Sequence, residues 1–353
     1  MNMKCVLNKK ENFRAAVLIN NRSNLKIVEN IIFPKIKKLQ VLVKILYTSV
    51  CGSQLFEIFG KRGKDKYLPH TLGHEATGVV IKVGKNVKRL KMGDRVFLSW
   101  IKNNEEKDAL KVTYKSRNFK KIINSGHITT FSNYSVVSSN RVYKLPHSVN
   151  LISGCLLSCA LPTGAGMILG EDQKINNNNK KILIIGLGGV GLSSLLTAIY
   201  KRYKEIYAVD SNLSRIRFLK KKLKKYNISY HQNLLKFKNL KFDLIIESTG
   251  SSKIISSSVN YLKNNGKLIF ASHPKFNDKI IIDPYDLILG KKILGSWGGN
   301  INFKKDLKQL IKIIKFYKNV ENIYFPKLYK FEDINIAIND FRKGKILRPI
   351  IYF

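Results

Sequence analysis

The chain has 353 residues, 44% of them hydrophobic, and a formal net charge of +41. This length exceeds what one hydrophobic core usually holds, so we expect two domains, and the apolar content excludes a disordered protein. A nucleic-acid binder would gather its basic residues in a stripe with interleaved aromatic residues. Here Lys and Arg are spread along the whole chain. We therefore expect no nucleic-acid partner, although the charge would attract anionic substrates.

Cysteine content and hydropathy predict the compartment. The segment Met1–Phe13 lacks the apolar stretch of a signal peptide, so a reducing cytoplasm is expected. The uncharged run Leu151–Gly170 has the length of a membrane span, but its Pro162, glycines and hydroxyl residues favour packed loop and helix, and no membrane association is expected. Four cysteines are too few for a disulfide scaffold: Cys5, Cys51, Cys155 and Cys159.

The first 150 residues are predicted to be mainly β. They carry short runs rich in β-branched residues and closely spaced glycines, without a long helical period. Strands are expected at 14–18, 25–33 and Val41–Val50. Loops between such strands would carry the chemistry.

After Leu145-Pro146 the pattern changes to alternating strands and helices, which predicts a doubly wound parallel sheet. Helices are expected at Lys304–Tyr317 and Phe331–Lys343, and a last strand at Arg348–Phe353. The lysine run Lys220–Lys225 is predicted to be the solvated face of a helix. The expected strands of the parallel sheet are Ile182–Gly186, Ile206–Val209, Phe242–Glu247, Lys267–Ala271 and Ile293–Trp297.

The stretch Lys181–Asp210 has the order strand, glycine turn, helix, strand that a G-x-G-x-x-G motif needs before it indicates a dinucleotide site. Gly186 permits a tight turn, Gly188 lets the backbone approach a pyrophosphate, and Gly191 lets the helix pack closely on the strand. The helix N-terminus offers unpaired N–H groups to the phosphates. The motif residues are Gly186, Leu187, Gly188, Gly189, Val190 and Gly191.

Asp210 stands at the end of the next predicted strand. A carboxylate there accepts hydrogen bonds from the adenosine ribose hydroxyls and repels a 2′-phosphate. The sequence therefore favours NAD over NADP.

Three residues outside this stretch form a candidate metal site. Cys51 follows a predicted strand, His74 lies in Gly73-His74-Glu75, and Cys159 precedes Pro162-Thr163-Gly164. Two thiolates and one imidazole suit Zn²⁺ and leave a fourth position open, as catalysis requires. Spacing alone equally fits buried structural cysteines.

Together these motifs resemble the zinc-dependent medium-chain alcohol dehydrogenases over essentially the whole chain. The resemblance implies a GroES-like catalytic domain from residues 1–163 and 298–353, with a Rossmann NAD-binding domain, 164–297, inserted between them. The motifs that carry it are Cys51-Gly52-Ser53, GHEATGVVIKVGKNV from Gly73, Gly93-Asp94-Arg95-Val96, Cys159 with Thr163-Gly164, GLGGVG, Asp210, FDLIIESTG from Phe242, and Gly344–Arg348.

The resemblance also implies residue roles. Cys51, His74 and Cys159 would bind one catalytic zinc per chain, Glu75 would be a carboxylate near the metal, and Ser53 would lie beside the zinc-bound oxygen and relay its proton. The remaining implied residues are Thr163 near the nicotinamide, Arg215 along the ribose and Arg348 at the cofactor phosphates. Arg215 and Arg348 are equally compatible with surface charge, and Arg215 means that NADP is not strictly excluded. Cys155 is predicted to be a core residue.

Several positions depart from the family pattern. Residues 97–140 contain no cysteine, so a second, structural zinc is not expected. Phe56 replaces the histidine that usually hands the proton to solvent, so the route beyond Ser53 must differ, through water or Glu57. Gln54 replaces an acid that orients the zinc-bound histidine. The amide oxygen of Gln54 could still accept a hydrogen bond from the N–H of that histidine. An uncharged amide would stabilise the positive metal less than a carboxylate does.

The implied reaction is reversible hydride transfer between an alcohol, bound on zinc as the alkoxide, and the nicotinamide of NAD. A polyol or sugar-linked biosynthetic dehydrogenase is the alternative within the family. A polyanion-binding protein or a catalytically retired relative is the alternative from another class. The partners expected are a small alcohol or carbonyl substrate and further copies of the chain, since Ile293–Trp297 resembles the strand that pairs subunits into a homodimer, or a homotetramer of such dimers.

Overall fold

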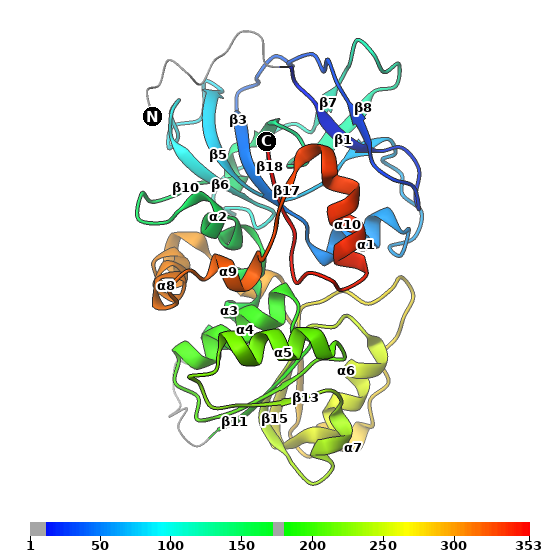
Figure 1. Ribbon diagram of the computed structural model, residues 1–353, viewed down its shortest axis with the longest axis vertical. Helices are drawn as coiled ribbons and strands as arrows, with labels where there is room; N and C mark the ends of the chain where they lie inside the picture. The colour runs from blue at the N-terminus through cyan, green and yellow to red at the C-terminus, as the bar shows by residue number, and fades with distance from the viewer. Residues whose placement is uncertain (1–11, 172–179) are drawn as a thin grey trace. The chain divides into compact units, whose positions relative to one another are not determined.

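A computed structural model describes residues 12–171 and 180–353. Cys5, like all of Met1–Phe13 except its last two residues, lies outside the described residues. The chain divides into two compact units (Figure 1). The first runs as far as Cys159 and includes Phe325–Phe353, and the second is Ala160–Tyr324.

The larger sheet of the first unit has the order β10-β6-β5-β3-β18-β17, with β9 also paired to β3. Its central strand β3 is buried along most of its length because both of its faces pack. Val41, Val43 and Ile45 enter one apolar cluster, and Leu42 enters another. The strands are β3 (Gln40–Ser49), β5 (Glu75–Val83), β6 (Arg95–Ser99), β9 (Tyr134–Ser138), β10 (Val142–Lys144), β17 (Leu328–Lys330) and β18 (Ile350–Tyr352).

The smaller sheet of this unit has the order β2-β1-β4-β8-β7. Ala15 and Val17 on β1 pack into the same cluster as Leu42, which joins the two sheets. The predicted strands at 14–18 and 41–50 are confirmed within about one residue, whereas 25–33 contains only the short strand β2. The strands are β1 (Ala15–Leu18), β2 (Lys26–Val28), β4 (His70–Thr71), β7 (Val112–Tyr114) and β8 (Ile123–Gly126).

The C-terminal segment completes the first unit. Strand β18 pairs antiparallel with β3, with Ile350 opposite Ser49, and β17 runs parallel to β18. Figure 1 shows β18 beside β3, so residues 350–352 lie in the same sheet as residues 40–49. Its helices are α1 (Gly52–Ile58), α2 (Leu151–Gly154) and α10 (Ile334–Arg342), with 3-10 helices at Ser139–Arg141, Cys155–Ser158 (η3) and Phe331–Asp333.

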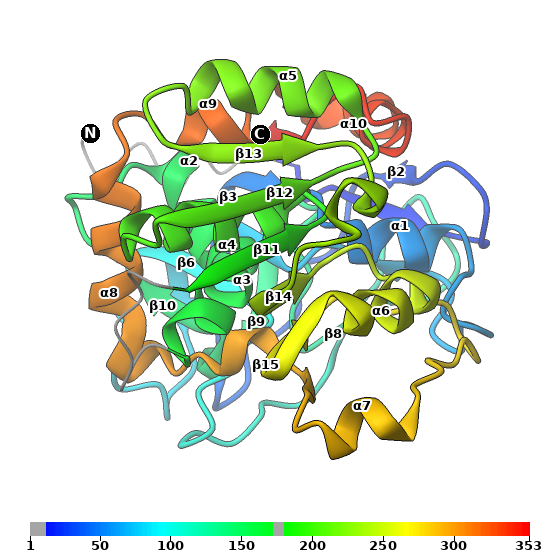
Figure 2. The same ribbon diagram turned by 90° about the horizontal axis from the view of Figure 1, so that it is seen from below.

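The second unit is a doubly wound parallel sheet of order β13-β12-β11-β14-β15-β16. Figure 2 shows β13, β12, β11, β14 and β15 side by side. From β11 the chain moves outward in both directions, and right-handed crossovers place α4 and α6 on opposite faces. The strands are β11 (Lys181–Ile185), β12 (Glu205–Val209), β13 (Ile228–His231), β14 (Phe242–Glu247), β15 (Leu262–Phe270) and β16 (Lys292–Gly295).

The helices of the second unit include the predicted lysine-rich one. On α5 the residues Lys220, Lys221 and Lys222 are exposed while Ile216 and Leu219 are buried, as expected for a solvated face. The helices are α3 (Ala160–Leu169), α4 (Gly189–Tyr200), α5 (Leu213–Lys222), α6 (Ser252–Ser258), α7 (Pro284–Ile288), α8 (Phe303–Phe316) and α9 (Glu321–Tyr324), with 3-10 helices at Leu234–Phe237, Val259–Tyr261 and Gly298–Asn300.

The second boundary differs from the sequence-based one. Residues 298–324, which the sequence assigns to the catalytic domain, group with the parallel sheet. The Tyr317 hydroxyl donates to the Leu196 carbonyl at 2.5 Å, and the Tyr324 and Ser193 hydroxyls lie 2.8 Å apart. These bonds attach the segment around α8 to helix α4.

The uncharged run 151–170 forms α2, η3 and α3, and Ala160–Ile168 is buried throughout. Within the described ranges no single helix is long and apolar enough to cross a membrane, although Leu151–Ser158 and Ala160–Leu169 pass that test together as a bent pair.

Candidate functional site

Four side chains of the first unit converge at one end of its larger sheet: Cys51, His74, Glu75 and Cys159. Their sulfur, nitrogen and oxygen atoms all lie within 4.8 Å of one another. Glu75 is fully buried, and Cys159 is 5% exposed. All three residues predicted as metal ligands are therefore in reach of a single ion.

Strand pairing brings the first two ligands together. Cys51 follows β3 and is the N-cap of α1, and His74 immediately precedes β5. Because β3 and β5 are antiparallel, with Thr48 opposite Ala76, the end of one strand lies beside the start of the other.

Cys159 is held at the same place by its neighbour in the chain. The Ser158 hydroxyl donates to the Ala76 carbonyl at 3.3 Å, and the Ser158 carbonyl accepts from the Ser99 hydroxyl at 2.5 Å. Cys159 thus follows a segment bonded to both β5 and β6.

Arg348 joins this cluster from the C-terminal end of the chain. It immediately precedes Pro349 and β18, and the pairing of β18 with β3 brings it to Glu75. Its guanidinium forms a buried ion pair with Glu75, whose carboxylate also accepts from the Ser49 hydroxyl. Burial is the largest single influence on the pKa of Arg348 and lowers it, but the charges of Glu75 and the two cysteines, with the hydrogen bond to Glu75, together raise it by more, so the arginine stays charged.

The contact of Arg348 with the cofactor phosphates stays a prediction. Its partner here is Glu75, although its Nε atom is buried without a hydrogen bond within the part of the chain that the structure describes. Ser49 was not singled out from the sequence. Its position could have identified it, because Ser49 lies two residues before Cys51 on a strand that ends at the site.

The pKa values of Cys51, Cys159 and His74 depend on one another because the three side chains are in contact. A hydrogen bond from the Cys159 thiol lowers the pKa of Cys51 well below its usual value, and the same contact raises the pKa of Cys159 well above it. Burial lowers the pKa of His74, but its contacts with Cys51 and Glu75 outweigh burial and raise it to about 10. Without metal we therefore expect a Cys51 thiolate, a Cys159 thiol and a His74 imidazolium at neutral pH.

These residues fit a zinc ion. Two sulfur atoms and one imidazole nitrogen form a donor set typical of zinc in which a fourth position stays open. The Nε2 atom of His74 is buried and has no hydrogen-bond partner among the described residues. It lies 3.5 Å from Glu75 Oε1, and neither Cys51 nor Cys159 forms a disulfide. A cation at this place would give His74 Nε2 and the two cysteine sulfur atoms a partner.

Gln54 links two of these ligands and differs from expectation. Its oxygen Oε1 accepts from the Cys51 backbone N–H at 3.0 Å, which is half of a capping box at the start of α1. Its amide nitrogen Nε2 lies 2.8 Å from His74 Nδ1. The sequence led us to expect the amide oxygen at His74, but that oxygen is engaged by Cys51.

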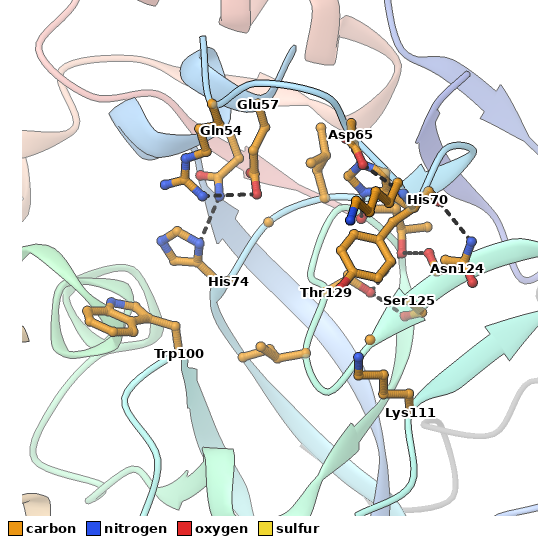
Figure 3. A pocket seen from close by; sticks show the side chains of 18 of the residues that line it. Gln54, Glu57, Asp65, His70, His74, Trp100, Lys111, Asn124, Ser125 and Thr129 are labelled. Carbon is orange, nitrogen blue, oxygen red and sulfur yellow. Dashed lines mark hydrogen bonds and ion pairs between the residues drawn. The ribbon is translucent and has the colours of Figure 1, made fainter. Parts of the chain in front are cut away.

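A pocket of about 550 Å³ opens beside His74 within the first unit. Figure 3 shows His74, Gln54 and Trp100 on its wall, with Lys111 and Asn124 across from them. Four of its 24 lining residues are Lys or Arg, about the share in the whole chain, 64 of 353. The pocket is thus no more basic than the chain as a whole.

The candidate proton-relay residues lie on α1. The Ser53 hydroxyl is buried and has no hydrogen-bond partner among the described residues. Glu57 lines the pocket one turn after Gln54 and pairs with Arg62 at 3.3 Å, while Phe56 contacts Lys61. The carboxylate of Glu57 is therefore the titratable group of α1 that faces the pocket.

In the second unit the glycine turn has the expected geometry. Gly186 has φ +83°, which favours glycine, and a Cβ on Gly191 would lie 1.7 Å from the Gly186 carbonyl oxygen. A Cβ on Gly188 would meet no atom within 4 Å, so its Cα faces open space at the N-terminus of α4. Gly189 and Val190 begin that helix.

Asp210 lies at the end of β12 beside this turn and is 5% exposed. Its carboxylate accepts from Leu187 N–H at 2.7 Å, from Asn212 N–H at 2.8 Å and from Arg215 at 2.9 Å. Arg215 is therefore paired with Asp210 rather than being loose surface charge. Thr163, on α3, is buried, and its hydroxyl has no partner within the described ranges.

Comparison with known proteins decides the family. Residues 37–147 match the alcohol dehydrogenase GroES-like domain, and residues 189–315 match the zinc-binding dehydrogenase domain. The chain belongs to the zinc-type medium-chain dehydrogenase/reductase family. The predicted fold class, a Rossmann unit inserted in a mainly β GroES-like domain, is thereby confirmed.

Relatives cover nearly the whole chain. It is 28% identical to alcohol dehydrogenase class-2 isozyme 2 of Oryctolagus cuniculus, with 89% of this chain and 91% of the relative covered. It is 25% identical to S-(hydroxymethyl)glutathione dehydrogenase of Photobacterium damsela subsp. piscicida, with 96% and 99% covered. The structure of benzyl alcohol dehydrogenase from Acinetobacter calcoaceticus matches with a TM-score of 0.83 at 26% identity, covering 97% and 99%. The chain is therefore an oxidoreductase of the alcohol dehydrogenase family.

The protonation of the cluster predicts how zinc binding depends on pH. Zinc ligation requires two thiolates and a neutral imidazole, so Cys159 and His74 would each lose a proton. We expect the release of about two protons per zinc at pH 7, and an affinity that rises with pH. Titration calorimetry in buffers of different ionisation enthalpy measures this number. Release of no protons would contradict the assigned protonation.

Proposed function

We propose that this protein is a zinc-dependent, NAD-linked alcohol dehydrogenase that interconverts a small alcohol and its carbonyl product. The observation that carries the proposal is the convergence of Cys51, His74 and Cys159 beside the pocket. The Gly186 turn with Asp210 supports a dinucleotide cofactor in the same chain. A polyol or sugar alcohol is the alternative substrate, and a screen of both classes separates them.

Each cofactor would supply one part of the chemistry. Zn²⁺, when bound, would act as a Lewis acid that lowers the pKa of the alcohol hydroxyl, and NAD would accept the hydride. Cys51, His74 and Cys159 would hold the metal, with Glu75 near it and paired with Arg348. Trp100 lines the pocket beside His74 and would contact the alcohol there.

Ser53 is proposed to take the alcohol proton. Its hydroxyl is buried on α1, next in sequence to Gln54, which lines the pocket. Because Phe56 carries no ionisable group, the proton would continue to Glu57, whose carboxylate faces the pocket, or to water.

We propose NAD as the physiological cofactor. The buried Asp210 carboxylate would accept the ribose hydroxyls and disfavour a 2′-phosphate. Its pairing with Arg215 keeps that arginine from offering its charge to such a phosphate.

A homodimer is proposed through the sheet edge at β16. This edge strand exposes Leu294 (42%), and nearby residues of the same unit expose Ile281 (82%), Ile288 (78%) and Trp297 (80%). An exposed edge strand next to large apolar side chains is a site for pairing with another copy. A homotetramer of such dimers is the larger assembly consistent with the same edge.

Loss of a metal ligand should abolish turnover. Purified protein is expected to hold about one zinc per chain by metal analysis, and Cys51→Ser or His74→Ala should lower NAD-linked alcohol oxidation by at least ~1000-fold, because the Lewis acid is lost. Cys155→Ser is the matched control. Burial raises the pKa of Cys155 to about 12, and it is not among the clustered ligand atoms, so zinc content and turnover should persist. Near-normal turnover in zinc-free protein would contradict the mechanism.

Removal of the Asp210 carboxylate should shift cofactor preference. In Asp210→Ser the Arg215 guanidinium loses its partner and becomes free to pair with a 2′-phosphate. We expect the ratio of kcat/KM for NAD to that for NADP to fall by about tenfold or more, which corresponds to ~1.4 kcal/mol. Asp210→Ser with Arg215→Ala is the control and should not gain NADP activity. An unchanged ratio in the single variant would exclude this role of Asp210.

Charge at the exposed sheet edge should separate the subunits. Sedimentation of the double variant Leu294→Lys with Ile288→Lys is expected to show a monomer where the native chain shows a dimer, because like charges would face each other across the axis. Leu235→Lys is the control, since Leu235 is 79% exposed in the same unit but belongs to a different element. A native chain that sediments as a monomer would refute the proposed interface.

A further inference from the structure

Residues 100–111, which we call the wall loop, connect β6 to β7 without a helix or strand. Both ends of the wall loop line the pocket, Trp100 directly after β6 and Lys111 directly before β7. Figure 3 shows Trp100 on the side of His74 and Lys111 across the pocket. A segment outside regular secondary structure depends on side-chain contacts for its shape. These contacts therefore decide where one wall of the pocket stands.

The second end of the wall loop is attached by uncharged hydrogen bonds. The Ala109 N–H donates to the Ser138 hydroxyl at 2.8 Å, and the Leu110 carbonyl accepts from the Gln40 amide at 3.0 Å. Ser138 is the last residue of β9 and Gln40 is the first residue of β3, so this end is bonded to the larger sheet. It provides a fixed point to which the first end can be connected.

Arg141 connects the two ends of the wall loop. Its Nη1 atom donates to the Trp100 carbonyl, and its Nη2 atom lies 3.7 Å from Asp108 Oδ1. One guanidinium group thus bridges the first residue of the loop and the residue before Ala109. Arginine suits this contact because its N–H donors form a rigid planar fork. The Arg141 side chain is 15% exposed, so water competes little for these contacts.

Asp108 has a second basic partner, which is less suited to hold the loop. Asn140 donates to Asp108 Oδ1 at 3.0 Å, and this hydrogen bond is the main cause that lowers the pKa of Asp108, which is therefore ionised at neutral pH. Lys102 lies 3.2 Å from Asp108 Oδ2, but its side chain is 44% exposed. Exposed ion pairs contribute little to stability. Arg141, which also reaches Trp100, is the partner that fixes the loop.

We propose that Arg141 is a positioning residue for substrate binding. By bonding to Trp100 and Asp108 together, it fixes the backbone from which the Trp100 indole projects beside the pocket. Without the guanidinium, the first end of the wall loop would lose this connection to the fixed end, and the indole would occupy a wider range of positions. The effect on the substrate rests on the proposed function, whereas the effect on Trp100 does not.

Tryptophan fluorescence measures the effect on Trp100. The chain has two tryptophans, Trp100 and Trp297, so in Trp297→Phe the fluorescence reports on Trp100 alone. In this background Arg141→Met is expected to raise the acrylamide quenching constant by about twofold or more, because a segment with fewer fixed contacts opens more often. Circular dichroism of the same samples checks that the variant is folded. An unchanged quenching constant in the folded variant would overturn the proposal.

Lys102→Met is the matched control. It removes the other cation beside Asp108 but leaves the hydrogen bond from Arg141 to the Trp100 carbonyl in place. The quenching constant of Trp100 should therefore stay at the value of the Trp297→Phe background. An increase equal to that in Arg141→Met would assign the effect to the lost charge at Asp108, and the proposed role of Arg141 would be wrong.

Arg141→Lys keeps the test decisive if Arg141→Met does not fold. Lysine retains the positive charge, but its single nitrogen replaces the planar fork that reaches Trp100 and Asp108 together. We expect a quenching constant above that of the Trp297→Phe background. The background value in folded Arg141→Lys would show that the two-sided contact is not needed, which contradicts the proposal.

Steady-state kinetics measure the effect on the substrate. A wall that contacts the alcohol contributes to its binding, so Arg141→Met should raise the KM for the alcohol by about tenfold while kcat and the KM for NAD stay within about twofold of the native values. A raised quenching constant with an unchanged KM for the alcohol would overturn the role in substrate binding. Absence of turnover in the native protein would refute the proposed function and, with it, the effect on the substrate. The quenching constants would still decide whether Arg141 positions Trp100.

Discussion

The buried ion pair between Glu75 and Arg348 ties the candidate site to the fold of the whole first unit. Neither charge is exposed, and a buried charge without its partner costs several kcal/mol, so the two must be brought together as the chain folds. Glu75 begins β5, and Arg348 precedes β18, so they meet because both strands pair with β3. The last strand of the chain is therefore a requirement for the site. The arginine also offsets the negative charge of Glu75 and the Cys51 thiolate, which would otherwise repel each other at close range.

The sequence predicts this site well where local pattern determines structure. The end of β3 at Cys51, the parallel strands β11, β12 and β14, and the Gly186 turn all follow from short apolar runs next to residues with special backbone needs. Helix α1 was not predicted, because its seven residues are too few for a helical period and its start depends on a cap made with Gln54. Strand β13 was missed as well, since its half-buried residues show no continuous apolar run. The unit boundary near residue 324 depends on hydrogen bonds from Tyr317 and Tyr324 to α4, which only the folded chain shows.

The orientation of Gln54 shows a second limit of sequence reasoning. The family resemblance implies that the side chain at this position contacts His74, and it does. Which end of the amide faces the ring is decided elsewhere, by the unpaired N–H at the start of α1. The thiolate of Cys51 and the carboxylate of Glu75 meanwhile favour a protonated ring. Glu75 Oε1 lies 3.5 Å from His74 Nε2, so its charge favours a hydrogen on that nitrogen, on the side of the ring away from the Gln54 amide.

The distribution of acidic residues supplies an argument about the extreme charge. The chain has 23 Asp and Glu residues against 64 Lys and Arg. Yet both candidate sites keep a buried acid paired with an arginine, Glu75 with Arg348 and Asp210 with Arg215. A lysine added at an exposed position is solvated and changes stability little, whereas loss of a buried acid leaves its partner charge unpaired. The basic residues therefore accumulate at exposed positions where a substitution changes stability little, as on the outer face of α5. The net charge is a property of the surface and not of the chemistry of the sites.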